Sequence, residues 1–196
     1  MLFPIYMNQL SPAAAFERAK RIQTDLKSHP ETEKFFKTLS FVPDDFQKIA
    51  CQALEEGFGV LVAAPTGAGK TVVGEFAATL ASSNEGKCFY TTPIKALSNQ
   101  KFNELSQKFG ESKVGLLTGD SNINPDAQIV VMTTEVLRNM IYSNSSNLNQ
   151  LRYVVMDEVH YLADKFRGAV WEEILIHLPE SVRIVSLSAT VSNAEE

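Results

Sequence analysis

Residues 64–71 have the types and the spacing of a phosphate-binding loop. Gly67 and Gly69 let the backbone curl, so that successive N–H groups can point at phosphate oxygens. Lys70 is expected to reach the outer phosphates of a nucleotide, and the Thr71 hydroxyl is expected to hold Mg²⁺. The sequence therefore predicts a nucleoside triphosphate site formed by Ala64, Pro65, Thr66, Gly67, Ala68, Gly69, Lys70 and Thr71.

The segments on either side of this loop are those that such a loop requires. Residues 59–63 form a short apolar run that predicts a strand. After the loop, apolar residues recur with helical spacing at Val72, Val73, Phe76, Ala77 and Leu80. A helix that begins at the loop adds the positive end of its dipole to the phosphate site.

Two adjacent carboxylates, Asp157 and Glu158, are the second candidate for chemistry. They follow residues 152–156, a run that predicts a strand. Beside a phosphate-binding loop, we expect Asp157 to hold Mg²⁺ and Glu158 to orient and deprotonate the water that attacks the γ-phosphate. An Asp-Glu pair alone could simply begin a turn or a helix, so this interpretation depends on the loop. Lys70, Asp157 and Glu158 are the predicted catalytic residues.

The elements that must position these residues alternate along the chain. Strands are expected at residues 59–63, 87–91, 114–117, 128–132, 152–156 and 183–187, and helices at 46–56, 94–109, 135–142 and 169–177. Short apolar strands separated by helices predict an α/β fold with a mostly parallel sheet and helices on both faces. Ligands of such sheets bind at the carboxyl ends of the strands, where the loop and the carboxylates fall.

Length and composition fit one globular domain with a small appendage. The chain has 196 residues and a net charge of −5, which excludes a polybasic binder but allows a local nucleic-acid groove. Cys51 and Cys88 lack the spacing of a metal site, so we expect buried, reduced thiols in a cytoplasmic protein. No run of the sequence is long enough to span a membrane.

Residues 1–40 are predicted to form a short helical extension before the main domain at residues 41–196. Ser11 and Pro12 are typical of a helix start, and a second helix is expected at residues 31–39. Residues 18–27 are locally basic. A solvated helix face and a nucleic-acid contact both remain open interpretations of that basic segment.

Several ordered motifs resemble the superfamily-two helicases of the DExH-box type. They are APTGAGKT at residues 64–71, with alanine in place of the first glycine, DEVH at 157–160 and SAT at 188–190. DEVHYLAD at 157–164, TPIKALSNQK at 92–101, LTGD at 117–120 and VMTTEVLRNM at 131–140 are similar to superkiller-type RNA helicases and their actinobacterial relatives. The resemblance covers residues 41–196 and implies the first of two RecA-like lobes of a P-loop NTPase.

The resemblance also implies roles for residues that spacing alone does not assign. Gln47 matches the position that reads adenine, and Phe41 would either stack on the base or join the core. The candidate nucleic-acid contacts are Pro93, Lys95, Thr118, Gly119, Asp120, Thr133, Thr134 and Glu135. The residues that would couple nucleotide state to nucleic-acid binding are His160, Ser188, Ala189 and Thr190. Each threonine could otherwise be an ordinary helix cap, and Lys101 either a phosphate contact or a plain surface charge.

By resemblance, the chain is the ATP-binding lobe of an ATP-dependent RNA helicase that uses ATP and Mg²⁺. Its implied partners are single-stranded nucleic acid, with RNA favoured over DNA, a second RecA-like lobe and an RNA-degradation complex. The sequence stops six residues after Thr190, so we expect the isolated chain to be weakly active or inactive. A DNA helicase or translocase lobe is one alternative. A nucleotide-dependent binding module without hydrolysis is another, although it would not need Glu158.

Overall fold

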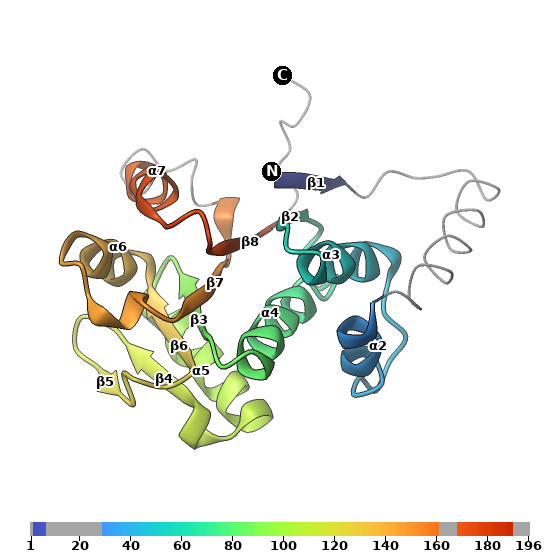
Figure 1. Cartoon of the computed structure of the whole chain (residues 1–196), viewed down its shortest axis with the longest axis horizontal. Coiled ribbons are helices and arrows are strands. Elements are labelled where there is room, and N and C mark those ends of the chain that lie inside the picture. The colour runs from blue at the N-terminus through green and yellow to red at the C-terminus, as the bar shows by residue number, and fades with distance from the viewer. Residues whose placement is uncertain (1, 7–28, 161–167, 190–196) are drawn as a thin grey trace.

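A central sheet of eight strands organises the computed structural model, which describes residues 2–6, 29–160 and 168–189 (Figure 1). The strands are β1 (Leu2–Tyr6), β2 (Gly59–Ala63), β3 (Lys87–Thr92), β4 (Val114–Leu117), β5 (Asn122–Ile123), β6 (Ile129–Thr133), β7 (Leu151–Met156) and β8 (Arg183–Ser188). Their order across the sheet is β1-β2-β8-β7-β3-β6-β4-β5. Neighbouring strands are parallel, except that β5 runs antiparallel to β4.

Helices cover both faces of this sheet. They are α2 (Pro30–Phe36), α3 (Asp45–Glu55), α4 (Thr71–Ser83), α5 (Lys95–Phe109), α6 (Thr134–Tyr142) and α7 (Gly168–His177), with short 3₁₀ turns at Glu111–Lys113 and Ser146–Leu148. In Figure 1, α6 and α7 lie together on the side of the sheet away from α3 and α4. The helices return the chain so that the parallel strands begin at the same end of the sheet, except that β4 is joined to β6 through the antiparallel β5.

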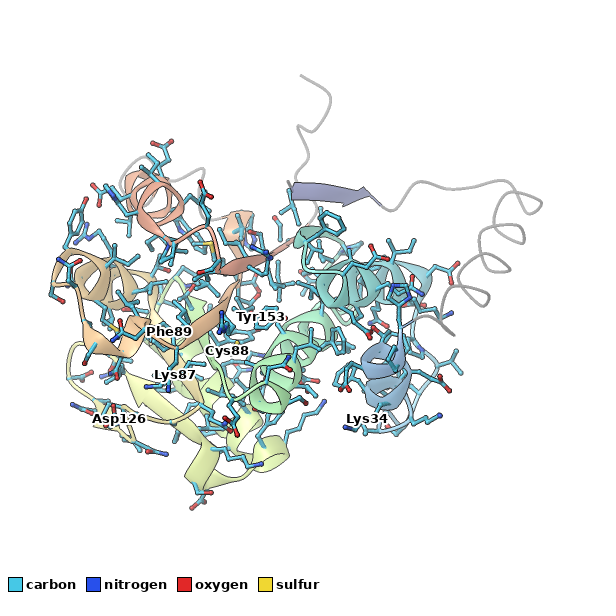
Figure 2. The ribbon with its side chains drawn as sticks, viewed as in Figure 1. Lys34, Lys87, Cys88, Phe89, Asp126 and Tyr153 are labelled. Atoms are coloured by element: carbon cyan, nitrogen blue, oxygen red, sulfur yellow. The ribbon has the colours of Figure 1, made fainter. Side chains whose placement is uncertain are left out.

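Two apolar cores form because successive side chains of a strand point to opposite faces of the sheet. On β3, Cys88 and Tyr90 join the core beneath α2, α3, α4 and α5. Phe89, between them, joins the core beneath α6 and α7, together with Leu137 and Trp171 (Figure 2). The strands β3, β6 and β7 are therefore apolar on both faces, which the continuous apolar runs in the sequence indicate.

The observed elements confirm the predicted α/β fold with a mostly parallel sheet. Each predicted strand is present, with bounds that differ by at most one residue at either end. The helices predicted within the described residues are also present, and a short N-terminal helix, α2, precedes the main domain. Phe35 of α2 is buried, and its ring centroid lies 5.1 Å from that of Phe76. This helix therefore packs directly on the core of the main domain.

Two observed strands lie outside the predicted set. The strand β1 pairs in parallel with β2 from Leu2 opposite Gly59 to Tyr6 opposite Ala63, so the extension is not purely helical as predicted. A five-residue apolar run carries too little periodicity to reveal its structure. The strand β5 has two residues and forms a hairpin with β4. The helix predicted near Ser11 and the basic residues 18–27 lie outside the described residues.

The two thiols are where the sequence predicts them. Cys51 and Cys88 are both free and buried, and burial raises the pKa of the Cys88 thiol to about 12. Neither thiol is therefore ionised near neutral pH. Among the described residues, no helix is both long enough and apolar enough to cross a membrane.

Candidate active site

The predicted phosphate-binding loop joins the end of β2 to the start of α4. Gly67 and Gly69 adopt φ angles of +83° and +78°, a region in which side chains other than that of glycine are strained. The Ala64 N–H donates to the Ser188 carbonyl at 3.2 Å. The loop therefore has the left-handed turns that its glycines predict, and it begins beside the end of β8.

The Lys70 side chain folds back over this loop. Its Nζ donates to the carbonyl oxygens of Ala64 at 2.7 Å and Pro65 at 3.0 Å. Pro65, Thr66 and Gly67 are exposed, so an anion could approach the ammonium group from solvent. Phosphate oxygens could then replace the two carbonyl acceptors without leaving Lys70 unpaired.

The two carboxylates follow the end of β7. The Asp157 N–H donates to the Thr91 carbonyl at 2.9 Å, and Asp157 Oδ1 accepts from the Glu158 N–H at 2.9 Å. Glu158 has a φ angle of +56°, a left-handed conformation that is uncommon for residues with a side chain. Its Oε2 lies 3.2 Å from Nδ1 of His160. Hydrogen bonds thus fix the turn that carries both carboxylates.

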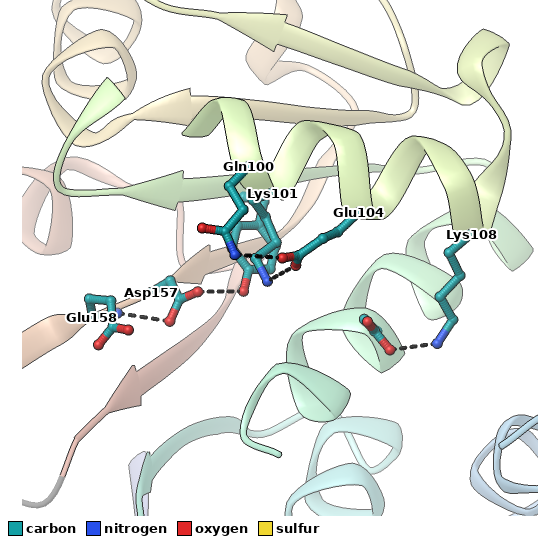
Figure 3. A network of polar contacts seen from close by, with 8 residues as sticks. Gln100, Lys101, Glu104, Lys108, Asp157 and Glu158 are labelled. Atoms are coloured by element: carbon teal, nitrogen blue, oxygen red, sulfur yellow. Dashed lines mark hydrogen bonds and ion pairs between the residues drawn. The ribbon is translucent and has the colours of Figure 1, made fainter. Parts of the chain in front are cut away.

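A cleft of about 340 Å³ brings the loop and the carboxylates together. The predicted residues that line it are Thr66, Gly67, Gly69, Lys70, Thr71, Asp157 and Glu158. The rest of the lining comes from the end of β3 and from α5, namely Thr92, Leu97, Gln100, Lys101 and Glu104. Figure 3 shows Gln100, Lys101 and Glu104 of α5 on the side of the cleft near Asp157. Residues separated by almost 90 positions in the sequence therefore share one concave site.

Sequence reasoning missed Tyr90, Gln100 and Glu104. Tyr90 is fully buried, and its hydroxyl donates to Asp157 Oδ2 at 2.7 Å. Burial raises the pKa of Tyr90 well above its usual range, and the neighbouring Asp157 acts in the same direction, so the hydroxyl stays a donor. A tyrosine in the middle of an apolar strand is itself a signal, because a buried hydroxyl needs a hydrogen-bond partner.

Lys101 is part of the site and is not a plain surface charge. Its side chain is paired with Glu104, and its Nζ lies 5.5 Å from the centroid of the Tyr90 ring. Gln100 Nε2 donates to the other carboxylate oxygen of Glu104 at 2.8 Å. Burial raises the pKa of Glu104, but the hydrogen bonds from Lys101 and Gln100 outweigh it and leave that pKa below its usual value.

Thr71 and Asp157 fit the ligand set of a Mg²⁺ ion bound together with phosphate. Both residues line the cleft, and both carboxylate oxygens of Asp157 have hydrogen-bond donors that fix their orientation. Within residues 2–6, 29–160 and 168–189, no group of three or more His, Cys, Asp or Glu side chains could hold a metal by itself. A single carboxylate and a hydroxyl, completed by phosphate oxygens and water, is a common environment for Mg²⁺.

Gln47 and Phe41 differ in their relation to the loop. Gln47 is buried, its Nε2 donates to the Gly69 carbonyl at 2.9 Å, and its Oε1 accepts from the Asp44 N–H at 2.9 Å. This second bond belongs to a capping box at the start of α3. Phe41 is exposed and is not part of the cleft lining. The adenine role of both residues stays a prediction.

The candidate nucleic-acid contacts follow the ends of β3, β4 and β6. Lys95, the first residue of α5, forms an ion pair with Asp120 in the turn after β4. Hydrogen bonds from Lys95 and Thr118 hold the pKa of Asp120 below its usual value. Gly119 lies in the same turn. Pro93 lies between β3 and α5, and Thr133, Thr134 and Glu135 form the start of α6. Contact with nucleic acid stays a prediction for all of them.

Of the predicted coupling residues, Ser188 and Ala189 lie at the end of β8. The Ser188 hydroxyl donates to the Ala189 carbonyl at 2.8 Å, and the Ser188 carbonyl accepts from the loop at Ala64. This strand end is therefore in direct contact with the phosphate-binding loop. Thr190 lies outside the described residues.

Known helicases are similar to this chain in sequence. The sequence model described as "DEAD/DEAH box helicase" matches residues 44–196. The "Probable helicase HelY" of Mycobacterium leprae is 64% identical over 166 residues, which are 85% of this chain and 18% of that protein. The "Antiviral helicase SKI2" of Saccharomyces cerevisiae is 51% identical over 156 residues, or 80% of this chain and 12% of that protein. The chain thus spans less than a fifth of the length of these relatives.

Solved structures share the fold. The helicase Lhr of Mycobacterium smegmatis, bound to single-stranded DNA and AMP-PNP, superposes with a TM-score of 0.64 at 29% identity, over 84% of this chain and 25% of that chain. The UvsW helicase of bacteriophage T4 has a TM-score of 0.63 at 20% identity and covers 80% of this chain and 58% of that chain. The second likeness shows the fold alone.

Proposed function

The chain belongs to the DEAD/DEAH box helicase family, and from that premise we propose that it is the ATP-binding first lobe of an ATP-dependent helicase that acts on single-stranded RNA. Residues 41–196 form this lobe in the proposal, and residues 1–40 are its extension. The observation that carries the proposal is the cleft in which Lys70 and Thr71 face Asp157 and Glu158. These residue types are the ones that bind a nucleoside triphosphate and position water at its γ-phosphate.

Four residues of the cleft have tasks in the proposed reaction. Lys70 exchanges its carbonyl acceptors for outer phosphate oxygens of ATP. Thr71 and Asp157 are the residues that would hold Mg²⁺, and the ion would supply positive charge to offset that of the phosphates. Glu158 orients a water molecule and accepts its proton while the water oxygen bonds to the γ-phosphorus. The bond between that phosphorus and the bridging oxygen breaks, and ADP and phosphate are released.

The preference for RNA is supported by one relative and by the sequence resemblance. The "DExH-box ATP-dependent RNA helicase DExH15 chloroplastic" of Arabidopsis thaliana is 49% identical to this chain over 172 residues, and LTGD and TPIKALSNQK match the pattern of superkiller-type RNA helicases. The Lhr structure contains single-stranded DNA, which makes a DNA helicase the second candidate. Comparing equal lengths of oligo(U) RNA and oligo(dT) DNA as stimulants of hydrolysis separates the two.

The isolated chain is expected to bind ATP but to hydrolyse it slowly. In helicases of this type, a second lobe supplies arginine side chains to the phosphates. Such arginines contribute about 10³- to 10⁵-fold to turnover in related phosphoryl-transfer enzymes. We propose that the rest of the protein, including that lobe, is needed for unwinding and is also where partners in RNA degradation would bind.

Two substitutions test the proposed site. Lys70→Ala removes the ammonium group that faces the phosphates, so ATP affinity should fall at least about tenfold. Glu158→Gln keeps the shape of the side chain but removes the base, so binding should persist while phosphate release falls by about 10²-fold or more. Calorimetric titration with MgATP and a phosphate-release assay, with and without oligo(U), measure both effects.

Lys113→Ala is the matched control, because Lys113 is exposed and lies outside the cleft. It should leave both readouts unchanged. ATP binding that survives Lys70→Ala unaltered would contradict the proposed site. Hydrolysis stimulated equally in Glu158→Gln and in the unmodified chain would contradict the proposed base.

A further inference from the structure

A buried tyrosine holds the carboxylate that the proposed mechanism assigns to Mg²⁺. The Tyr90 hydroxyl donates to Asp157 Oδ2 at 2.7 Å, and the Glu158 N–H donates to Oδ1 at 2.9 Å. With a donor on each oxygen, the plane of the Asp157 carboxylate is fixed. The remaining lone pairs of the carboxylate are then available to a metal ion in the cleft.

The Tyr90 ring is in turn held from the α5 side. Lys101 Nζ lies 5.5 Å from the ring centroid, a cation–π distance. Only 9% of Lys101 is exposed, and its ammonium group is paired with Glu104 on the same helix. Figure 3 shows Lys101 and its partner Glu104 on α5, near Asp157 and Glu158. A displacement of α5 would therefore move the support of the Asp157 carboxylate.

The same helix begins at a candidate nucleic-acid contact. Lys95 is the first residue of α5, and Lys101 follows it by six positions, or about 9 Å along a helix. Glu104 lies one further turn along. The end of α5 that faces the candidate nucleic-acid track and the side chain that supports Tyr90 thus belong to one rigid element.

We propose that Tyr90 is a positioning residue that orients Asp157 for the metal ion, and that Lys101 couples this orientation to α5 and so to bound nucleic acid. Tyr90 acts through Asp157 and does not touch the substrate. The inference rests on the proposed function, since it needs a Mg²⁺-nucleotide site in this cleft.

The first test measures how strongly Mg²⁺ improves nucleotide binding. A fluorescent ATP analogue is titrated into the chain with Mg²⁺ and, separately, with EDTA. In Tyr90→Phe, the gain in affinity that Mg²⁺ provides should shrink about tenfold, as is common when a group that orients a metal ligand is removed. Affinity in EDTA should stay within about twofold of the unmodified chain, because the phosphate-binding loop is unchanged.

Two controls separate positioning from packing. Tyr153→Phe removes the same hydroxyl from β7 at a residue outside the cleft lining, and it should change neither affinity. At position 90, 4-aminophenylalanine restores a donor and should recover the Mg²⁺ gain. Should Tyr90→Phe fail to fold, 4-fluorophenylalanine fills the space of the hydroxyl without donating and takes its place.

The outcomes distinguish a failure of the proposed nucleotide site from a failure of the role of Tyr90. A chain that binds the analogue equally well with Mg²⁺ and with EDTA contradicts the proposed function itself. Mg²⁺ could instead improve nucleotide affinity by the same factor in the unmodified chain and in Tyr90→Phe. That result would overturn the role of Tyr90 but not the proposed function. If Tyr153→Phe also lost the gain in affinity with Mg²⁺, the cause would be a general packing effect. The role of Tyr90 would then be overturned as well.

The coupling is tested by the ratio of Mg²⁺-nucleotide affinities with and without saturating oligo(U). Lys101→Met keeps the apolar stem but removes the cation, and it should bring this ratio close to one. Lys108→Met is the matched control, since Lys108 lies on the same helix, 5.1 Å from the Phe35 ring, and pairs with Glu75. A ratio of one in the unmodified chain, or an equal loss in both variants, overturns the coupling.

Discussion

At the scale of single residues, Glu158 combines a proposed chemical task with an unfavourable backbone. Its φ of +56° lies in the left-handed region, which costs a residue with an ordinary side chain about 1 kcal/mol or more. Asparagine tolerates this region better. The unfavourable conformation stands at the residue that would act as the base, where strain is frequently retained for function.

We therefore expect Glu158→Asn to raise the free energy of unfolding by about 0.5–1 kcal/mol, while hydrolysis is lost. The midpoint of thermal unfolding should rise by about 1–4 °C for a chain of this size. Glu158→Gln is the control, because it also removes the carboxylate but keeps a residue that disfavours the left-handed region. Equal midpoints for the Asn and Gln variants would show that backbone strain is not the cause.

Residue identities in the loop and at the end of β7 are predictable because their chemistry is local. The glycines of the loop need only the φ angles that they adopt, and Asp157 and Glu158 are recognised once the loop is known and a strand precedes them. Tyr90 is different, since its partner lies 67 positions away and on a different strand. Gln47 shows the same limit, because only the fold reveals that its carboxamide is bonded to the loop at Gly69.

At the scale of elements, Gly74 lets α4 lie close to the sheet. A Cβ at this position would lie 3.0 Å from the Tyr90 ring and 3.1 Å from Val155. Tyr90 cannot easily retreat, since its hydroxyl is bonded to Asp157. The helix therefore rests on β3 and β7 at the place where the proposed metal ligand is supported.

Gly74→Ala should lower the free energy of unfolding by about 1 kcal/mol, because overpacking of about 1–3 kcal/mol outweighs the gain of up to about 1 kcal/mol in helix propensity. Urea denaturation measures this change. Gly119→Ala is a suitable control, because a Cβ at Gly119 would meet nothing within 4 Å. A higher free energy of unfolding for Gly74→Ala would show that β3 and β7 can shift to make room for the added methyl group.

The strands of the sheet interior are predictable from the sequence, whereas its two edges are not. Interior strands such as β6 and β7 are apolar on both faces, which gives a continuous signal. The edge strands β1 and β5 depend on pairing with β2 and β4. Neither the five residues of β1 nor the two of β5 contain a pattern that predicts this pairing. Long-range pairing is what single-sequence reasoning cannot supply.

At the scale of the whole molecule, two cores share one set of strands. Trp171, the one tryptophan of the sequence, lies in the core beneath α6 and α7. Cys51 and Cys88, the two cysteines, lie in the other core. These residues report on opposite faces of the sheet, and β3 and β7 contribute side chains to both cores.

Because the cores share their strands, we expect them to unfold together. Tryptophan fluorescence and thiol labelling across a urea gradient should give coincident midpoints and a single transition. Native thiols should resist labelling near neutral pH, because burial keeps them protonated. Labelling that precedes the fluorescence change would instead show that the layer of α2 to α5 opens first.

Thr92 connects the starts of two helices through its hydrogen bonds. Its hydroxyl contacts the Ile94 carbonyl at 3.0 Å and the Ser98 hydroxyl at 2.7 Å, and its carbonyl accepts from the Thr134 hydroxyl at 3.2 Å. The starts of α5 and α6 are thus pinned to one strand end. If the starts of both helices contact a nucleic-acid backbone, the spacing between those two contacts is set by hydrogen bonds through this one residue.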